Sequence, residues 1–198
     1  MSGFFVPRTK FIRFAEREVM IFSIEKLTQR NQELLPHMQQ AFDVIGKVIP
    51  NYNGREWTLT EVLADFTVSK TYPDDIYDSA EYVENENQAA YVAIVDEKCV
   101  GSIRVCRRWN GNAFIEDLSV DRAYRHCGIG KALMDAAFEW SREKGLQGVS
   151  LETQDNNVLA IRFYLKYGFH LGGIDTNVYT DPNCIGETAF YFYADNKL

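Results

Sequence analysis

The spacing of apolar residues changes along the chain, and each spacing predicts a different element. In residues 20–28 apolar and polar positions alternate, which predicts a half-buried strand. Between residues 34 and 49, and again between 57 and 66, apolar residues recur every three or four positions. This pattern predicts two helices separated by a turn at residues 51–54. The apolar positions are Leu34, Leu35, Met38, Phe42, Ile45 and Ile49, then Trp57, Leu59, Val62, Leu63 and Phe66.

The second half of the chain reads as strands interrupted by helices. Residues 89–96 and 99–109 predict two strands joined by a tight turn near Glu97–Lys98. Asn110–Gly111 predicts a hairpin with a type I′ turn, because both positions tolerate a positive φ. The remaining predicted elements are a strand at 112–120, a helix from Gly128 to Gly145, a strand at 148–154, a helix at 157–166, and strands at 169–174 and 188–193.

This order of elements predicts a mixed α/β fold with helices packed on a mainly antiparallel sheet. Neither an internal repeat nor a low-complexity linker divides the chain, so we expect a single domain over residues 20–198. Residues 1–19 are poorly periodic and mildly basic. We expect them to form an N-terminal arm that the domain does not need, with Met20 as an alternative start.

Charge and cysteine usage exclude several classes of function. The net charge is −7 and the pI is about 5.0, which argues against a nucleic-acid-binding protein. Cys99, Cys106, Cys127 and Cys184 lie far apart and without metal-ligand spacing, so we expect reduced thiols, no metal and a cytoplasmic protein. The sequence has neither an apolar run of membrane-spanning length nor the pattern of a signal peptide, so we expect no membrane partner.

The stretch RHCGIGKA at residues 125–132 carries the most chemical information. Its glycines stand where a strand gives way to a helix, so backbone N–H groups at the helix start could bind an anion such as a pyrophosphate. A P-loop would need Gly and Ser or Thr where this chain has Arg125 and Ala132. A dinucleotide-binding fingerprint would need a third glycine where this chain has Leu133.

A third pattern fits: Arg/Gln-x-x-Gly-x-Gly/Ala after a strand, the acetyl-coenzyme A loop of GNAT-type N-acetyltransferases. Residues 20–195 resemble this family, and the long stretch LETQDNNVLAIRFYLKYGFHLGGID at 151–175 is most similar to its streptothricin acetyltransferase branch. The resemblance implies acetyl-CoA as cosubstrate and a sheet with a splayed strand pair and helices on both faces. The positions implied to bind the cofactor are Leu118, Val120, Arg125, His126, Cys127, Gly128, Ile129, Gly130, Lys131, Asn157 and Ala160.

The resemblance also implies two catalytic residues. Tyr164 matches a tyrosine that faces the coenzyme sulfur and, with a pKa near 10, could protonate the leaving thiolate. An alkyl ammonium must lose a proton before it attacks, and Glu116 is the candidate base. Strand alternation places Glu116 on the face of Leu118 and Val120.

The base assignment has rivals. Asp117 and Glu152 are alternative carboxylates, water could mediate the transfer, and some branches of the family carry their glutamate where this chain has Phe114. Asn157 should also cap the helix that follows it. The acceptor amine would attack directly, because no His–Asp pair supports Cys127 as a nucleophile.

The acidic, tyrosine-bearing segment 71–87 predicts the substrate class. Carboxylates and aromatic faces suit ammonium or guanidinium groups, and the branch resemblance selects the β-lysine amine of streptothricin. The candidate substrate-binding residues are Tyr72, Asp74, Asp75, Tyr77, Glu81 and Glu152. A protein lysine or N-terminal acetyltransferase and a non-catalytic acyl-CoA sensor are the alternatives, and a homodimer is an open expectation.

Overall fold

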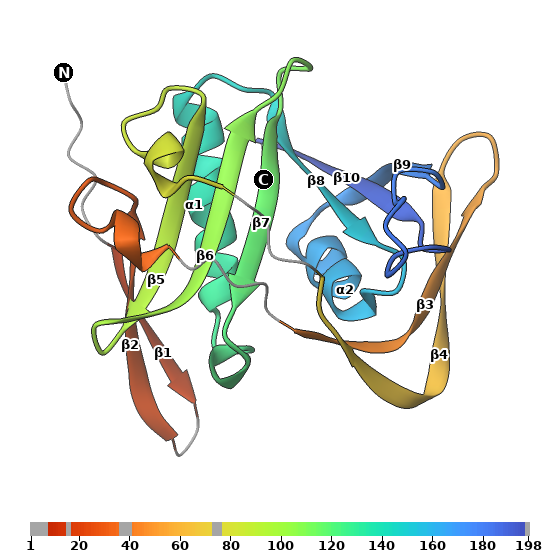
Figure 1. Cartoon of the computed structure of the whole chain (residues 1–198), viewed down its shortest axis with the longest axis horizontal. Coiled ribbons are helices and arrows are strands. Elements are labelled where there is room, and N and C mark those ends of the chain that lie inside the picture. Colours follow the sequence, from red (N-terminus) through yellow and green to blue (C-terminus); the bar gives the residue numbers. More distant parts are fainter. Residues whose placement is uncertain (1–7, 15–16, 36–40, 73–76, 197–198) are drawn as a thin grey trace. The chain divides into compact units, whose positions relative to one another are not determined.

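The computed structural model describes residues 8–14, 17–35, 41–72 and 77–196, with side chains from residue 21 onward. These residues form two compact units (Figure 1). Unit 1 contains the described residues before 36 together with residues 77–147, and unit 2 contains residues 41–72 and 148–196. Antiparallel strands packed with helices confirm the mixed α/β class, whereas the splayed strand pair stays a prediction.

Unit 1 is built on an antiparallel sheet in the order β1-β2-β5-β6-β7. The strands are β1 (Arg8–Phe14), β2 (Arg17–Lys26), β5 (Gln88–Val95), β6 (Lys98–Arg107) and β7 (Ala113–Val120). Helix α1 (Ile129–Glu143) and the short 3-10 helices η1 (Gln32–Leu34), η2 (Ser79–Tyr82) and η3 (Arg122–Tyr124) complete the unit. None of the helices in the described ranges is long and apolar enough to cross a membrane.

Both faces of β5 are covered, which explains its nearly continuous apolar sequence. Helix α1 packs on the face that carries Ile103, and its Leu133 and Trp140 are fully buried. On the opposite face, Tyr82 of η2 packs with Ala90 and Val92 of β5 in a second buried cluster. The second cluster brings the η2 segment onto the sheet beside the polar side chains of β6.

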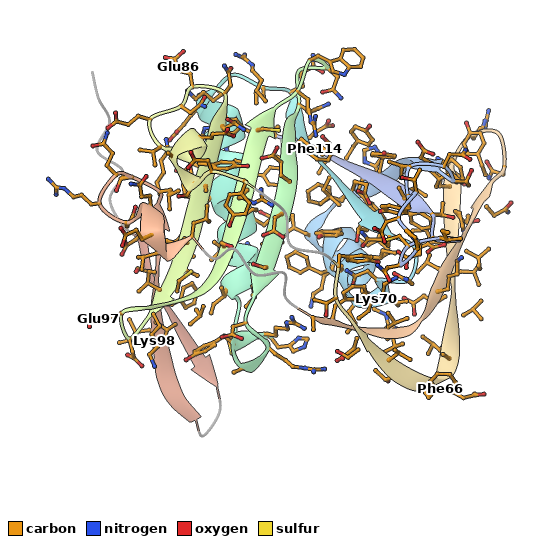
Figure 2. All side chains as sticks on the ribbon, viewed as in Figure 1. Phe66, Lys70, Glu86, Glu97, Lys98 and Phe114 are labelled. Carbon is orange, nitrogen blue, oxygen red and sulfur yellow. The ribbon has the colours of Figure 1, made fainter. Side chains whose placement is uncertain are left out.

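Two tight turns connect β5, β6 and β7. Asp96 and Glu97 have φ values of 47° and 65°, as the predicted turn before Lys98 requires. Figure 2 labels Glu97 and Lys98 at this turn. At the second turn only Gly111 has a positive φ, 81°, and its N–H donates to the carbonyl of Arg108 at 3.1 Å. The predicted type I′ turn at Asn110–Gly111 is therefore wrong, because a longer loop places only Gly111 in the left-handed region.

Unit 2 contains an antiparallel set in which β10 lies between β8 and β9. Its elements after residue 147 are β8 (Gly148–Gln154), α2 (Val158–Tyr167), β9 (His170–Asp175) and β10 (Ala189–Asp195). It also contains the hairpin of β3 (Phe42–Tyr52) and β4 (Trp57–Lys70). Buried Phe190 and Phe192 of β10 form much of its core. The helices predicted at 128–145 and 157–166 and the strands predicted after residue 147 are confirmed.

The hairpin β3–β4 contradicts the two helices predicted over residues 34–66. Residues 42–52 pair with 57–70 across a turn in which the N–H groups of Arg55 and Glu56 donate to Asn53 Oδ1. The segments are rich in β-branched Val, Ile and Thr, which favour strands, and Pro50 would interrupt a helix. The three-to-four-residue apolar spacing does not mark the buried face of a helix, because β4 is exposed along almost its whole length.

The amino-terminal segment also differs from the expectation. Residues 8–14 and 17–19 lie in β1 and β2, which pair in the register Phe11↔Ile21 at the edge of the sheet. The structure therefore gives regular secondary structure to most of the predicted arm, and its dispensability stays a prediction.

Candidate active site

The glycine loop of unit 1 has the backbone geometry of an anion site. His126 and Gly128 have φ values of 63° and 79°, and Gly128 is the N-cap of α1. The N–H of Ala132 donates to the carbonyl of Gly128 at 3.0 Å, so the N–H groups between these residues precede the first helical hydrogen bond. They lie at the positive end of the helix dipole, which fits a pyrophosphate.

Side chains of the loop contribute unequally to such a site. Arg125 Nε donates to the carbonyl of Val120 at 2.9 Å, which ties the loop to the end of β7. Lys131 forms an exposed ion pair with Asp135 at 2.8 Å. Ile129 is 1% exposed, and the Cys127 thiol donates a hydrogen bond to a backbone carbonyl. For both residues we therefore expect the backbone, and not the side chain, to contribute to the site.

A β-bulge in β7 sets the direction of Glu116. Val105 of β6 pairs with Ile115 and Arg104 pairs with Asp117, so no β6 residue stands opposite Glu116. Leu118 and Val120 pair with Ile103 and Gly101, on the α1 face of the sheet.

Glu116 instead lies with Phe114 and Arg104 on the opposite face, in the lining of a pocket. The predicted shared face of Glu116, Leu118 and Val120 is therefore wrong, because the bulge shifts the alternation by one residue.

This pocket, of about 710 Å³, brings together several predicted residues within unit 1. Tyr77 and Glu81, predicted to bind substrate, and Glu116, predicted as base, all line it. The complete lining is Tyr77, Asp78, Glu81, Tyr82, Gln88, Arg104, Arg108, Phe114 and Glu116. The lining carries both signs of charge, with Asp78, Glu81 and Glu116 against two arginines.

Arg104 is one of the pocket residues that the sequence analysis missed. It is 5% exposed, and its guanidinium lies 4.0 Å from the centre of the Tyr77 ring and 5.9 Å from that of Tyr82. The protein's own cation therefore stacks on the tyrosines that were expected to receive the substrate's cation. An arginine at an interior position of an otherwise apolar strand was the signal that could have revealed it.

Burial and the Glu116 carboxylate raise the pKa values of two neighbouring groups, the Tyr82 hydroxyl and the Cys106 thiol. Burial and the hydrogen bond to Glu116 raise the pKa of Tyr82 to about 12. Burial and the negative charge of Glu116 raise the pKa of the Cys106 thiol to about 12 as well. Both groups are therefore protonated at neutral pH, and Cys106 lacks the low pKa of a nucleophilic cysteine.

Unit 2 holds the other predicted catalytic residue. Tyr164 is 8% exposed on α2, and its ring contacts Phe169 and Phe192 at centroid distances of 5.9 and 6.1 Å. Asn157 caps the helix as predicted, since its Oδ1 accepts from the N–H of Ala160 at 3.3 Å. The helix start is therefore fixed, and Tyr164 lies nearly two turns into it.

Glu152 and Tyr72 lie in the polar interior of unit 2. Glu152 accepts a hydrogen bond from the Tyr179 hydroxyl, and burial raises the pKa of the Glu152 carboxyl. Tyr72 donates to Glu187 Oε2 at 2.6 Å and stacks on Phe42, and burial raises its pKa above the ordinary value. Both predicted substrate residues are thus engaged in hydrogen bonds of the fold.

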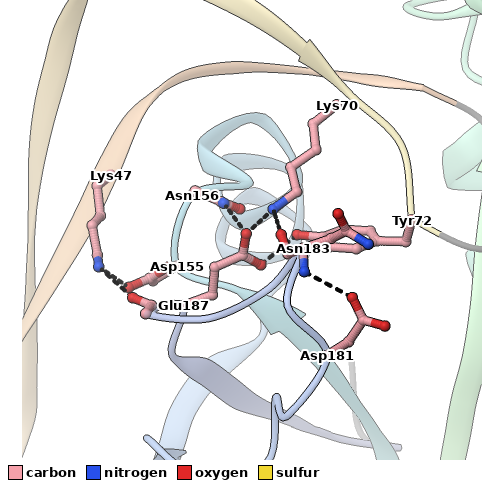
Figure 3. Close-up of polar contacts among 9 residues, drawn as sticks. Lys47, Lys70, Tyr72, Asp155, Asn156, Asp181, Asn183 and Glu187 are labelled. Carbon is pink, nitrogen blue, oxygen red and sulfur yellow. Dashed lines mark hydrogen bonds and ion pairs between the residues drawn. The ribbon is translucent and has the colours of Figure 1, made fainter.

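Figure 3 shows the network around Glu187, which sequence reasoning did not find. Lys70 and Asn156 also contact the Glu187 carboxylate, and Lys47 pairs with the buried Asp155 at 2.8 Å. Asp74 and Asp75 lie outside the described residues. Among the side chains that are described, no three His, Cys, Asp or Glu residues are grouped as metal ligands.

Comparison with known proteins gives this geometry a context. A model of the acetyltransferase (GNAT) family matches residues 57–169. Streptothricin acetyltransferase A of Bacillus subtilis (strain 168) is 38% identical over 170 residues, covering 86% of this chain and 98% of the relative.

Two solved structures resemble most of the chain. One is a Bacillus anthracis protein assigned as a streptothricin acetyltransferase, in complex with acetyl coenzyme A (TM-score 0.77, 34% identity, 88% of this chain and 99% of that chain). The other is a nourseothricin acetyltransferase (TM-score 0.73, 28% identity, 88% and 98%). With its glycine loop at the start of α1, the chain belongs to the acetyltransferase (GNAT) family and is an acetyl-CoA-dependent N-acetyltransferase.

Proposed function

We propose that the protein acetylates a primary amine of a small cationic molecule, the β-lysine amine of streptothricin, and so confers resistance to this antibiotic. The observation that carries the proposal is the similarity to streptothricin acetyltransferases over nearly the full length of both chains. The pocket beside Glu116 supports it, because the carboxylates of Asp78, Glu81 and Glu116 line it and suit an ammonium group.

The proposed coenzyme site uses the backbone of the loop and of β7. The N–H groups from Gly128 to Lys131 would hold the pyrophosphate, with Arg125 keeping the loop against β7. His126 and Cys127 would contribute through their backbone. Backbone groups of Leu118 and Val120 would hold the pantetheine arm, with Asn157 and Ala160 as further contacts.

Bound acetyl-CoA supplies an activated acetyl thioester. Glu116 would accept the proton that the acceptor ammonium must lose, because a free alkyl ammonium has a pKa near 10.4. Tyr164 would hold the proton given to the leaving thiolate. Its apolar surroundings keep water from its ring. The amine would attack directly, without a covalent enzyme intermediate.

We propose Tyr77 and Glu81 as the substrate-binding residues of the pocket, and Asp74 and Asp75, which lie outside the described residues, as further candidates. Tyr72 and Glu152 remain candidates in unit 2. Their polar atoms already bond to Glu187 and Tyr179, and a substrate would have to displace these partners.

A homodimer formed through β4 is part of the proposal. Among the described residues β4 pairs with β3 alone, and the strand carries exposed Leu63 and Phe66. Figure 2 shows Phe66 on this strand. A second copy of the same strand would satisfy the edge and cover these side chains. Light scattering should give twice the chain mass, and Phe66→Glu should give the mass of one chain. We also propose a cytoplasmic location, since the four cysteines are free.

The function is tested with purified protein, acetyl-CoA and a panel of cationic antibiotics. Release of free coenzyme A together with a mass increase of one acetyl group on streptothricin is the expected result. Coenzyme A release without modification of any cationic antibiotic would contradict the proposed substrate class.

A further inference from the structure

Three polar side chains of unit 1 form a continuous chain of hydrogen bonds that ends at Glu116. Arg104 Nη1 donates to Tyr82 Oη at 3.2 Å, and Tyr82 Oη donates to Glu116 Oε2 at 2.8 Å. The residues come from three separate elements, β6, η2 and β7. No part of the general chemistry of acetyl transfer requires this arrangement.

The chemistry of the groups fixes the direction of the chain. A guanidinium can only donate and a carboxylate can only accept, so the Tyr82 hydroxyl accepts a hydrogen bond from Arg104 and donates one to Glu116. The raised pKa of Tyr82 keeps that proton on the tyrosine at neutral pH. Hydrogen bonds with an ionised partner are the strong ones, which makes both links favourable.

Burial and packing fix the position of the Tyr82 side chain. Tyr82 is 3% exposed and packs with Ala90 and Val92, and Arg104 is 5% exposed and stacked on Tyr77. Glu116, by contrast, lies on a bulge where no β6 residue opposes it. The position of its carboxylate therefore depends on side-chain contacts more than on the register of the sheet.

We infer that Tyr82 is a positioning residue that fixes the Glu116 carboxylate for proton transfer from the acceptor amine. This inference rests on the proposed role of Glu116 as the base. Oε2 takes the hydrogen bond of Tyr82, and Oε1 accepts the proton from the ammonium. Tyr82 keeps its own proton throughout, and Arg104 orients its hydroxyl.

A double-mutant cycle on kcat tests the inference. Glu116→Gln should lower kcat by about 10²–10⁴-fold, the usual effect of one general base. Tyr82→Phe keeps the buried ring and should lower kcat by roughly 10-fold to 100-fold, as expected for one hydrogen bond to a charged group, with the KM for acetyl-CoA unchanged. In the Glu116→Gln background, Tyr82→Phe should have little further effect, because it acts through the missing carboxylate.

Two further variants complete the experiment. Tyr52→Phe also removes a tyrosine hydroxyl, but on the exposed β3–β4 hairpin, and should have wild-type kcat. Arg104→Lys keeps the charge and loses the planar stack on Tyr77, so it should lower kcat less than Tyr82→Phe. The melting temperature of each variant separates loss of positioning from loss of fold.

The outcomes distinguish the inference from the function on which it rests. If Glu116→Gln keeps wild-type turnover, Glu116 is not the base, and the proposed mechanism and the positioning role both fail. If Glu116→Gln loses activity while Tyr82→Phe has wild-type kcat, the base stands and the positioning role is wrong. Equal losses from Tyr82→Phe in both backgrounds would likewise overturn it, because a purely structural effect is independent of Glu116.

Discussion

Gly128 is the residue on which the proposed coenzyme site depends most directly. Its φ of 79° lies in the left-handed region, which a side-chain-bearing residue rarely adopts, and it is the N-cap of helix α1, whose first N–H groups are proposed to bind the pyrophosphate. A β-branched residue there would distort the loop.

We expect Gly128→Val to abolish acetyl-CoA binding measured by calorimetry. Gly54→Val is the matched control, because Gly54 has a φ of 92° at an exposed turn of the β3–β4 hairpin and should bear the same strain without loss of binding. Undiminished affinity of the Gly128→Val protein would mean that the loop does not hold the coenzyme.

Tyr164 allows the catalytic and packing roles of a buried tyrosine to be separated. The substitution Tyr164→Phe retains the ring contacts with Phe169 and Phe192 and removes only the hydroxyl. Tyr164→Phe should therefore lower kcat by about 10²–10⁴-fold with little change in the dissociation constant of acetyl-CoA. Wild-type turnover, in conditions where product release does not limit the rate, would identify Tyr164 as a packing residue.

At the scale of elements, the β3–β4 hairpin is attached to the rest of unit 2 by ion pairs of unequal burial. Lys47 on β3 pairs with Asp155, whose side chain is 2% exposed, whereas Arg162 on α2 pairs with exposed Glu61 on β4. Removing one partner of a buried pair leaves an uncompensated charge, while an exposed partner is simply hydrated.

Lys47→Ala should lower the free energy of unfolding by about 3 kcal/mol, the low end for a buried pair because Lys47 is itself half-exposed. Arg162→Ala should cost at most about 1 kcal/mol. Adding Asp155→Asn to Lys47→Ala should restore part of the loss. Urea denaturation measures all three, and equal costs for the two single variants would contradict the difference in burial.

Much of the fold could be predicted because local signals agreed with the tertiary structure. The Asn157 cap and the glycines at 128 and 145 located the two α-helices. The hairpin at 42–70 was misread, because its apolar spacing fits a helix as well as an exposed strand. The β-branched composition was the better guide.

The site was less predictable, because it depends on contacts distant in the sequence. Glu116 was predicted as the base from the family resemblance, and that role stays a prediction. The direction of its side chain was misjudged, since a one-residue bulge leaves no trace in strand alternation. The stacking of Arg104 on Tyr77 joins residues from different elements, and neither spacing nor composition predicts such a pair.

At the scale of the whole molecule, charge and similarity point to the same substrate class. A chain with net charge −7 attracts cationic ligands, and this attraction is screened beyond about 8–10 Å at physiological ionic strength. Capture of a small polycation should therefore weaken as salt rises. A lysine-containing peptide shares the amine but lacks the compact array of cationic groups.

The most direct test of the central claim is kcat/KM for streptothricin against that for a lysine-containing peptide, measured with one preparation at one ionic strength. We predict a preference for streptothricin of at least about 10-fold, equivalent to roughly 1.4 kcal/mol of transition-state stabilisation. Equal or better use of the peptide would contradict the claim and identify the protein as a protein acetyltransferase that uses the same fold and coenzyme site.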